Sequence, residues 1–277
     1  MTTCWLSDSC NIEAFLQKAG RVTSLLFCSM IARVTNQSAS SKLIADLLIY
    51  LFDGQVHPLA APMETWLKDS RRFTTFITNS RDKIRKKIRT MQEQEHVQDL
   101  WLELETAYLL LRERSLSLVY ERQLGGARCP DFEVSFTTSL TFMLEVTRLR
   151  TQAHTTPLPD ISERIADTTC DKLGQLLPQR GNVLLVGVEG PCPTHGDLHA
   201  ALVRVQKRAE RNDAMFLQQK GFHDRADFFR QYQRLSEILV RGFQLQAGEP
   251  VVAWVNPQAK YPLPSKVRTV LHRSHTV

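Results

Sequence analysis

The sequence predicts an α/β protein in which a mixed β-sheet is flanked by helices and is preceded by an α-helical N-terminal region. Polar and apolar residues alternate along Pro130–Phe136 and again along Leu140–Arg148, which is the period of strands with one polar face and one buried face. The run Val183–Val188 is apolar throughout, as expected of a strand that is covered on both faces. Segments with helical spacing of apolar residues precede and separate these strands.

The first 95 residues lack strand-like alternation. Apolar residues at helical spacing run through residues 12–19 and 43–51, and the stretch Trp66–Tyr120 favours one or two long helices. We therefore expect a helical region over residues 1–95 and an α/β domain over residues 96–277.

The α/β domain contains further expected elements. In chain order these are a strand over Val119–Leu124, a helix over 160–177, helices over 197–212 and 224–243, a strand over Val251–Val255 and an irregular tail from Pro262. Asp160 and Glu163 have the spacing of a capping box, so Asp160 is expected to start its helix. The resulting order is helix, three strands, helix, strand, helices and strand, which agrees with a mixed sheet covered by helices.

Composition excludes several classes of protein. Hydrophobic residues make up 43% of the 277 residues, which is enough for a core. None of the six cysteines has C-x-x-C spacing, so a zinc ribbon or thioredoxin motif is not indicated. Scattered thiols and an N-terminus without a basic leader favour a reducing, cytoplasmic location, and no apolar stretch is long enough to span a membrane.

Charge changes sign along the helical region. The formal net charge of +6 suits a polyanionic partner such as nucleic acid. Eight Lys or Arg residues lie within residues 71–89, and five acidic residues lie within residues 93–105. Both runs are typical of solvated helix faces, and they also fit a basic arm for a phosphate backbone beside an acidic metal site.

Two acidic residues are expected on the polar faces of adjacent strands. If these strands form a hairpin, the carboxylates of Asp131 and Glu145 lie side by side. Neighbouring carboxylates repel each other, and a divalent cation relieves the repulsion. Because Mg²⁺ prefers oxygen ligands, the pair predicts a site for Mg²⁺ or Mn²⁺ that acts on a phosphate group.

These residues resemble the motifs of a nuclease family. Pro130-Asp131, the later Glu145-Val146-Thr147 and a preceding helix with Glu103-Leu104-Glu105 are similar to the PD-(D/E)XK superfamily, whose core is restriction-endonuclease-like. The resemblance covers about residues 98–190 and implies an α-β-β-β-α-β core and metal-dependent hydrolysis of phosphodiester bonds in nucleic acid. It implies that Asp131 and Glu145 hold the metal and that Glu103, or as a second choice Glu105, is the helical acid.

The chain departs from the family at one position. Thr147 stands where the family usually has Lys, and a hydroxyl cannot supply the positive charge that stabilises the transition state. Lys172 is the best replacement, since it shares a helix face with Ile165 and Leu176 that is expected to pack toward the sheet. Strand alternation sends the other nearby cation, Arg148, to the opposite face.

Three hypotheses about function follow. The first is a Mg²⁺-dependent nuclease that uses Glu103, Asp131, Glu145 and Lys172 as catalytic residues. The second, which Thr147 motivates, is a degenerate relative that binds nucleic acid or a protein without cleavage. The third is an interaction protein that docks a protein partner through residues 1–95.

Other candidate sites have less support. His195 and His199 have a spacing that suits zinc, with Cys192 nearby, but a polar loop entering a helix is the simpler interpretation. The segment Trp254–Pro257, with Lys260 and Tyr261 nearby, offers stacking and charge to a nucleic acid, although an aromatic residue on a late strand more often belongs to the core.

Overall fold

The computed structural model describes residues 41–91, 93–122, 130–149, 160–190, 192–243 and 251–275. The chain forms two compact units, Met1–Val56 and His57–Val277. In the first unit residues 41–52 are helical. The larger unit contains the sheet, all candidate site residues and residues 57–95, which the sequence-based division places in the N-terminal helical region.

Eight helices are described in the larger unit. They are α2 (Ala60–Asp69), α3 (Arg71–Thr90), α4 (Gln94–Arg112), α5 (Ile161–Leu173), α6 (His195–Glu210), α7 (Ala214–Gln219), α8 (Arg225–Tyr232) and α9 (Ser265–Ser274). The described strands are β1 (Leu116–Tyr120), β2 (Phe132–Phe136), β3 (Leu140–Arg148), β4 (Gly181–Val188), β5 (Leu235–Gly242) and β6 (Val252–Val255). No helix in the described ranges has the length and apolar character needed to cross a membrane.

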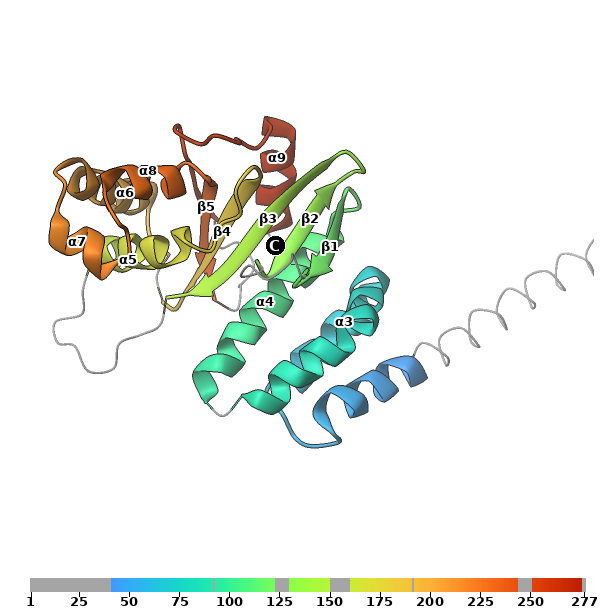
Figure 1. The fold of residues 1–277 in the computed structure, drawn as a ribbon. Helices are drawn as coiled ribbons and strands as arrows, with labels where there is room; N and C mark the ends of the chain where they lie inside the picture. Colours follow the sequence, from blue (N-terminus) through green and yellow to red (C-terminus); the bar gives the residue numbers. More distant parts are fainter. Residues whose placement is uncertain are drawn as a thin grey trace, which may run out of the picture. The chain divides into compact units, whose positions relative to one another are not determined.

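The strands form one mixed sheet in the order β1-β2-β3-β4-β5-β6 (Figure 1). The β1–β2, β2–β3 and β5–β6 pairs are antiparallel, whereas the β3–β4 and β4–β5 pairs are parallel. The parallel pairs require crossovers, which α5 and the group α6–α8 provide. The prediction of an α/β protein with a mixed sheet flanked by helices is thus confirmed.

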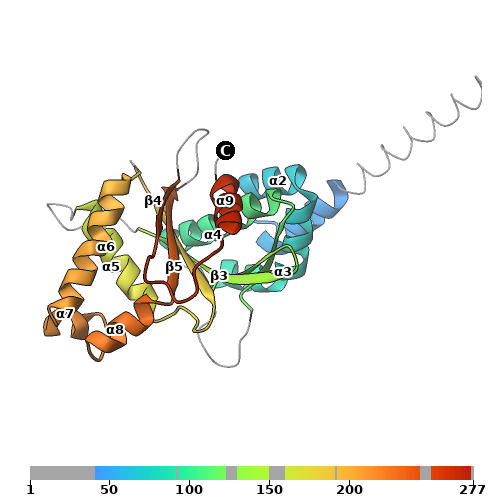
Figure 2. The ribbon, with the colours of Figure 1, turned by 90° about the horizontal axis from the view of Figure 1, so that it is seen from above.

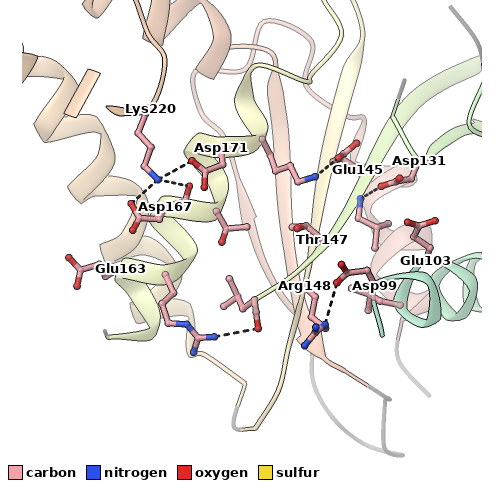
Figure 3. A pocket seen from close by; sticks show the side chains of 16 residues that line it. Asp99, Glu103, Asp131, Glu145, Thr147, Arg148, Glu163, Asp167, Asp171 and Lys220 are labelled. Carbon is pink, nitrogen blue, oxygen red and sulfur yellow. Dashed lines mark hydrogen bonds and ion pairs between the residues drawn. The ribbon is translucent and has the colours of Figure 1, made fainter. Parts of the chain in front are cut away.

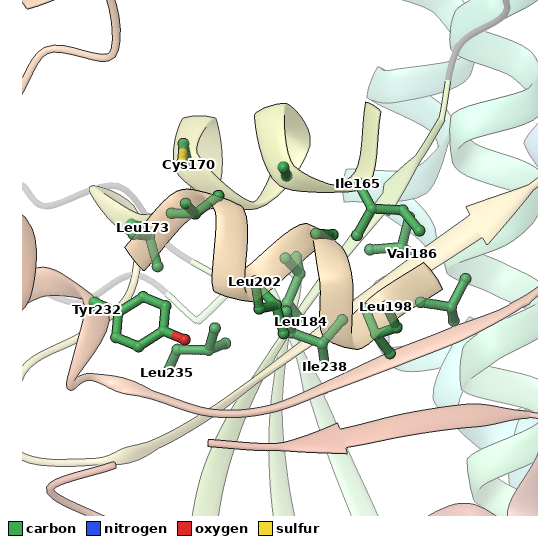
Figure 4. Packing of buried hydrophobic residues seen from close by; sticks show 14 of the residues in the cluster. Ile165, Cys170, Leu173, Leu184, Val186, Leu198, Leu202, Tyr232, Leu235 and Ile238 are labelled. Atoms are coloured by element: carbon green, nitrogen blue, oxygen red, sulfur yellow. The ribbon is translucent and has the colours of Figure 1, made fainter. Parts of the chain in front are cut away.

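Helices cover both faces of the sheet, as Figure 2 shows from above. On one face, Leu184 and Val186 of β4 pack into a buried cluster with Ile165 of α5 and Leu202 of α6 (Figure 4). Helices α3, α4 and α9 lie on the other face. There a Cβ atom added at Gly187 would lie 2.6 Å from Cδ2 of Leu102, so α4 approaches β4 closely because this position lacks a side chain.

Two expectations for the C-terminal part are wrong. The expected helix over 224–243 ends at Tyr232, and the chain continues as β5. All residues of β5 are buried, including the charged Glu237 and Arg241. Its sequence therefore lacks the alternation of polar and apolar residues that marks a strand with one exposed face. The tail after Pro262, expected to be irregular, contains α9.

Element boundaries are partly as expected. Strand β3 has the predicted bounds, whereas β1 begins at Leu116 rather than at Val119. Asp160 precedes α5 as its N-cap, but the predicted capping box is absent. Its carboxylate instead accepts a hydrogen bond from the hydroxyl of Ser162.

Candidate active site

The position of Asp131 follows from the β2–β3 hairpin. Phe132 of β2 pairs with Leu144 of β3 in an antiparallel register, so Asp131, one residue before β2, lies opposite Glu145. Oδ2 of Asp131 accepts a hydrogen bond of 2.8 Å from the backbone N–H of Val146, which ties the carboxylate to β3. The predicted pairing of the two strands is therefore found, and it brings the two predicted metal ligands to one place.

Glu145 is buried rather than exposed, with 5% of its surface accessible. Its Oε1 atom lies 2.7 Å from Nζ of Lys172, whose side chain extends from α5 toward β3. The predicted inward direction of Lys172 is thus found, and its side chain is 23% exposed. Gln175 lies on the same turn, with its Oε1 atom 3.4 Å from the Lys172 amine. The sequence predicts that this face of β3 is polar and exposed to solvent. In the structure α5 covers it, and the buried carboxylate of Glu145 pairs there with the ammonium group of Lys172.

Glu103 is held by two side chains that the sequence did not predict. Its carboxylate is 2.8 Å from Nζ of Lys87 on α3 and accepts a 2.6 Å hydrogen bond from the hydroxyl of Tyr120 on β1. Burial raises the pKa of Glu103, and the positive charge of Lys87 opposes that rise. Lys87 belongs to the basic run noted above, and its pairing with Glu103 depends on the packing of α3 against α4, which leaves no local pattern in the sequence.

The three acidic groups interact electrostatically. Burial raises the pKa of Asp131 well above its ordinary value, and the neighbouring carboxylates of Glu103 and Glu145 raise it further. Repulsion of this kind is the condition that a bound cation relieves. Glu103, Asp131 and Glu145, predicted from separate segments of the sequence, thus form one acidic cluster.

The cluster forms one side of a cavity of about 940 Å³ (Figure 3). The acidic residues of its lining are Asp99, Glu103, Asp131, Glu145, Glu163, Asp167 and Asp171, and the basic residues are Arg148, Arg164, Lys172 and Lys220. Across from the cluster, Nζ of Lys220 lies 3.2 Å from Asp167 and 2.9 Å from Asp171 of α5. Within the described part of the chain the lining therefore has more acidic than basic side chains.

Arg148 points to the other face of β3, as predicted. Its guanidinium is fully buried and forms ion pairs with Glu95, with Asp99 at 3.4 Å and with Glu189 at 2.5 Å. These contacts connect the beginning of α4 to the ends of β3 and β4. Arg148 is engaged there, which leaves Lys172 as the cation on Glu145.

Glu105, the second choice for the helical acid, has a different role. Its carboxylate pairs at 2.6 Å with the fully buried Arg241 of β5, and it does not line the cavity. Glu103 is therefore the acid of α4 that belongs to the cluster.

The alternative zinc site is not formed among the described residues. His195 and His199 are exposed on α6, and Cys192 is half-buried against the core. No group of three His, Cys, Asp or Glu side chains in the described ranges is arranged to enclose a metal ion. This finding also applies to the acidic cluster, which offers Asp131 and Glu145 as a pair of carboxylates. Mg²⁺ fits such a pair, because it usually keeps several waters and takes one or two protein carboxylates.

The fold and the site define an α/β protein with a six-stranded mixed sheet and a buried carboxylate–lysine cluster at the β2–β3 hairpin. Comparison with known proteins found no match among family models, curated proteins or solved structures.

Proposed function

We propose that this protein is a metal-dependent nuclease with a restriction-endonuclease-like core of the PD-(D/E)XK type. The contact between Lys172 and Glu145 beside Asp131 carries the proposal, because it supplies a cation where Thr147 replaces the usual Lys. The order α4-β1-β2-β3-α5-β4 also supports it, since this is the α-β-β-β-α-β order that the resemblance implies.

Each residue has a role in hydrolysis of a phosphodiester. Asp131 and Glu145 would hold Mg²⁺ or Mn²⁺, which when bound polarises the phosphate and makes water more acidic. Lys172 orients the attacking water and offsets the negative charge that develops on the phosphate oxygens. Water adds to phosphorus and one P–O ester bond breaks, so the products are a phosphate end and a hydroxyl end. Glu103, held by Lys87 and Tyr120, maintains the negative field around Asp131.

A second candidate function is binding of nucleic acid or of a protein without cleavage. Thr147 favours it, and so does the ion pair itself, because Lys172 already neutralises Glu145 and competes with a metal for that carboxylate. Salt-sensitive binding without turnover distinguishes this function from the first.

The compartment and the protein partner are further parts of the proposal. Cys170 is a buried free thiol, which fits a reducing, cytoplasmic location. Burial raises the pKa of Cys170 to about 12, so this thiol is not a nucleophile. A protein partner would dock on residues 1–95, as the third hypothesis holds.

The test is cleavage of labelled single-stranded and duplex DNA and RNA in Mg²⁺, Mn²⁺ or EDTA. We expect metal-dependent cleavage by the wild type and a loss of about 100-fold or more in Asp131→Asn, Glu145→Gln and Lys172→Met. Glu64→Gln and Lys68→Met are matched controls, because Glu64 and Lys68 form an exposed ion pair on α2 that makes the same contact away from the cavity. Unchanged cleavage in both Asp131→Asn and Glu145→Gln would refute the assignment of the site.

A further inference from the structure

A second cavity lies at the other end of β3 from Glu145. It has a volume of about 580 Å³. Its lining residues, here called the Arg180 groove, are Leu140, Thr141, Pro178, Gln179, Arg180, Gly181, Lys260, Tyr261, Pro262, Leu263 and Pro264. Among the residues that the structure describes, this lining contains two cations and no acid, the reverse of the excess of acids around Asp131. The groove is therefore complementary to an anion.

The two cations come from separate segments. Arg180 lies in the turn before β4, and its side chain is 41% exposed. Arg180 forms a long ion pair of 3.9 Å with Glu133, which also pairs with Arg122, so Arg180 is only loosely engaged. Lys260 is exposed in the segment after β6. Two long, accessible cations beside one groove are typical of a phosphate-binding surface.

Tyr261 adds an aromatic side chain that is held in place by its backbone. Its carbonyl accepts a 2.8 Å hydrogen bond from the hydroxyl of Ser236, and the N–H of Lys260 donates at 2.9 Å to the carbonyl of Gln233. This segment is therefore anchored to β5 and to the end of α8 before a ligand arrives. Trp254, by contrast, packs on Tyr232 at the edge of the core, with ring centroids 6.2 Å apart. Trp254 therefore packs against the core, whereas Tyr261 lines the groove.

The spacing along β3 connects the groove to the acidic cluster. Thr141 of the groove and Glu145 of the cluster lie four residues apart on β3, which is roughly 13 Å in a strand, and the buried Met143 lies between them on the same side, so this length is a separation and not a path along the strand. Stacked nucleotides advance about 3.4 Å along one strand, so about four of them cover this distance.

We propose that the Arg180 groove binds one phosphate and the adjoining base of the nucleic-acid strand that is cleaved at Asp131 and Glu145, a few nucleotides from the cleaved bond. The inference rests on the proposed nuclease function and adds to it a subsite for the substrate. Arg180 and Lys260 contact the phosphate, and the base stacks on Tyr261. The carboxylates of the acidic cavity repel the phosphate backbone of a nucleic acid. The groove therefore provides attractive contacts to that backbone outside the acidic cavity.

The test measures binding of a fluorescent single-stranded oligonucleotide in EDTA at low and physiological salt. We expect Arg180→Gln/Lys260→Gln to weaken binding about tenfold or more and to reduce the salt dependence by about two counterions. Tyr261→Ala weakens binding, whereas Tyr261→Phe keeps the stacking surface and binds like the wild type. Lys207→Gln/Arg211→Gln, which removes two exposed cations from α6 and its end, is the charge-matched control and binds like the wild type. Equal affinity of the groove variants and this control would overturn the inference.

Cleavage of a small phosphodiester, bis(p-nitrophenyl) phosphate, separates the subsite from the proposed function. This substrate cannot reach the groove, so the groove variants hydrolyse it at the wild-type rate but lose kcat/KM on a long oligonucleotide. If the wild type cleaves nothing while the groove variants lose binding, the nuclease function fails and the groove stands as a nucleic-acid site. If Asp131→Asn abolishes cleavage while the groove variants bind and cleave normally, the function stands and the groove inference fails.

Discussion

Lys172 of α5 and Glu145 of β3 form an ion pair of 2.7 Å across 27 residues of sequence. The pair closes the side of the acidic cluster that faces α5, where Thr147 supplies only a hydroxyl. In the proposed hydrolysis, the ammonium group of Lys172 is the positive charge that offsets the negative charge developing on the phosphate.

The role of Lys172 is tested by removing its positive charge and by placing a Lys at position 147 of β3 instead. We expect Lys172→Met to lower kcat by about 10²–10³, because a preorganised positive charge is lost. In the same variant, Thr147→Lys restores part of the activity, since Thr147 and Glu145 lie on one side of β3. The measurement is single-turnover cleavage of an oligonucleotide in Mn²⁺, with Lys68→Met as control. Wild-type rates in Lys172→Met would show that another group supplies the charge.

The raised pKa of Asp131 predicts how stability depends on pH. Folded Asp131 binds its proton more tightly than the unfolded chain does, so the free energy of unfolding falls as the pH rises from the ordinary pKa of 3.8 through the folded pKa. Asp131→Asn removes this loss. The variant should therefore be more stable than the wild type at neutral pH, and its advantage should disappear below the ordinary pKa. Urea unfolding at several pH values measures it.

Asp227 is a control of opposite sign for that experiment. Although burial opposes it, hydrogen bonds from Arg230, Gln231 and the backbone of His223 lower the pKa of Asp227 to about 2. Asp227→Asn should be less stable than the wild type at neutral pH, and this deficit should shrink as the pH falls through about 2. A loss of stability at neutral pH in Asp131→Asn, as in Asp227→Asn, would contradict the raised pKa of Asp131.

The buried ion pair of Glu105 and Arg241 is predicted to stabilise the fold rather than to act on substrate. Glu105→Leu leaves the fully buried Arg241 without its carboxylate, and we expect a loss of about 3–5 kcal/mol in the free energy of unfolding. The double variant Glu105→Leu/Arg241→Met should regain most of this loss, because apolar side chains can replace a buried pair. Equal stability of the single variant and the wild type in urea would contradict this role.

The close approach of α4 to the sheet predicts a steric effect at Gly187. A methyl group there would lie 2.6 Å from Leu102, so Gly187→Ala should push α4 outward and cost roughly 1–3 kcal/mol of stability. Because α4 carries Glu103, the rate of cleavage should fall as well. Thermal unfolding and cleavage assays measure the two effects. Leu102→Ala removes the side chain that the new methyl group meets, so the double variant Gly187→Ala/Leu102→Ala should lose the steric clash. If the steric effect of Gly187→Ala is the same in both backgrounds, another group causes it.

The sequence alone was sufficient for the part of the fold that carries the acidic pair. The sequence predicts β3 with its observed bounds, because Thr141, Glu145 and Thr147 recur on one side of the strand and Phe142, Leu144 and Val146 on the other. The same rule of side-chain direction predicted that Lys172 points inward and that Arg148 lies on the opposite face of the strand. Local periodicity is a reliable guide where one face of an element is polar and the other apolar.

The parts that the sequence did not reveal depend on contacts between distant residues. Strand β5 was predicted as helix, since Glu237 and Arg241 are charged yet buried, and their partners His272 and Glu105 come from α9 and α4. The support of Glu103 by Lys87 and Tyr120 was missed for the same reason. Such pairs follow from the packing of elements and leave no local pattern in the sequence.

Titration of Mn²⁺ into the protein at neutral pH by calorimetry is the most direct test of the idea that Asp131 and Glu145 share a divalent cation. We predict binding of Mn²⁺ to the wild type and to Glu64→Gln, and binding at least about tenfold weaker in Asp131→Asn and in Glu145→Gln. Equal binding in all four proteins, or no binding to the wild type, would contradict a metal site at this pair.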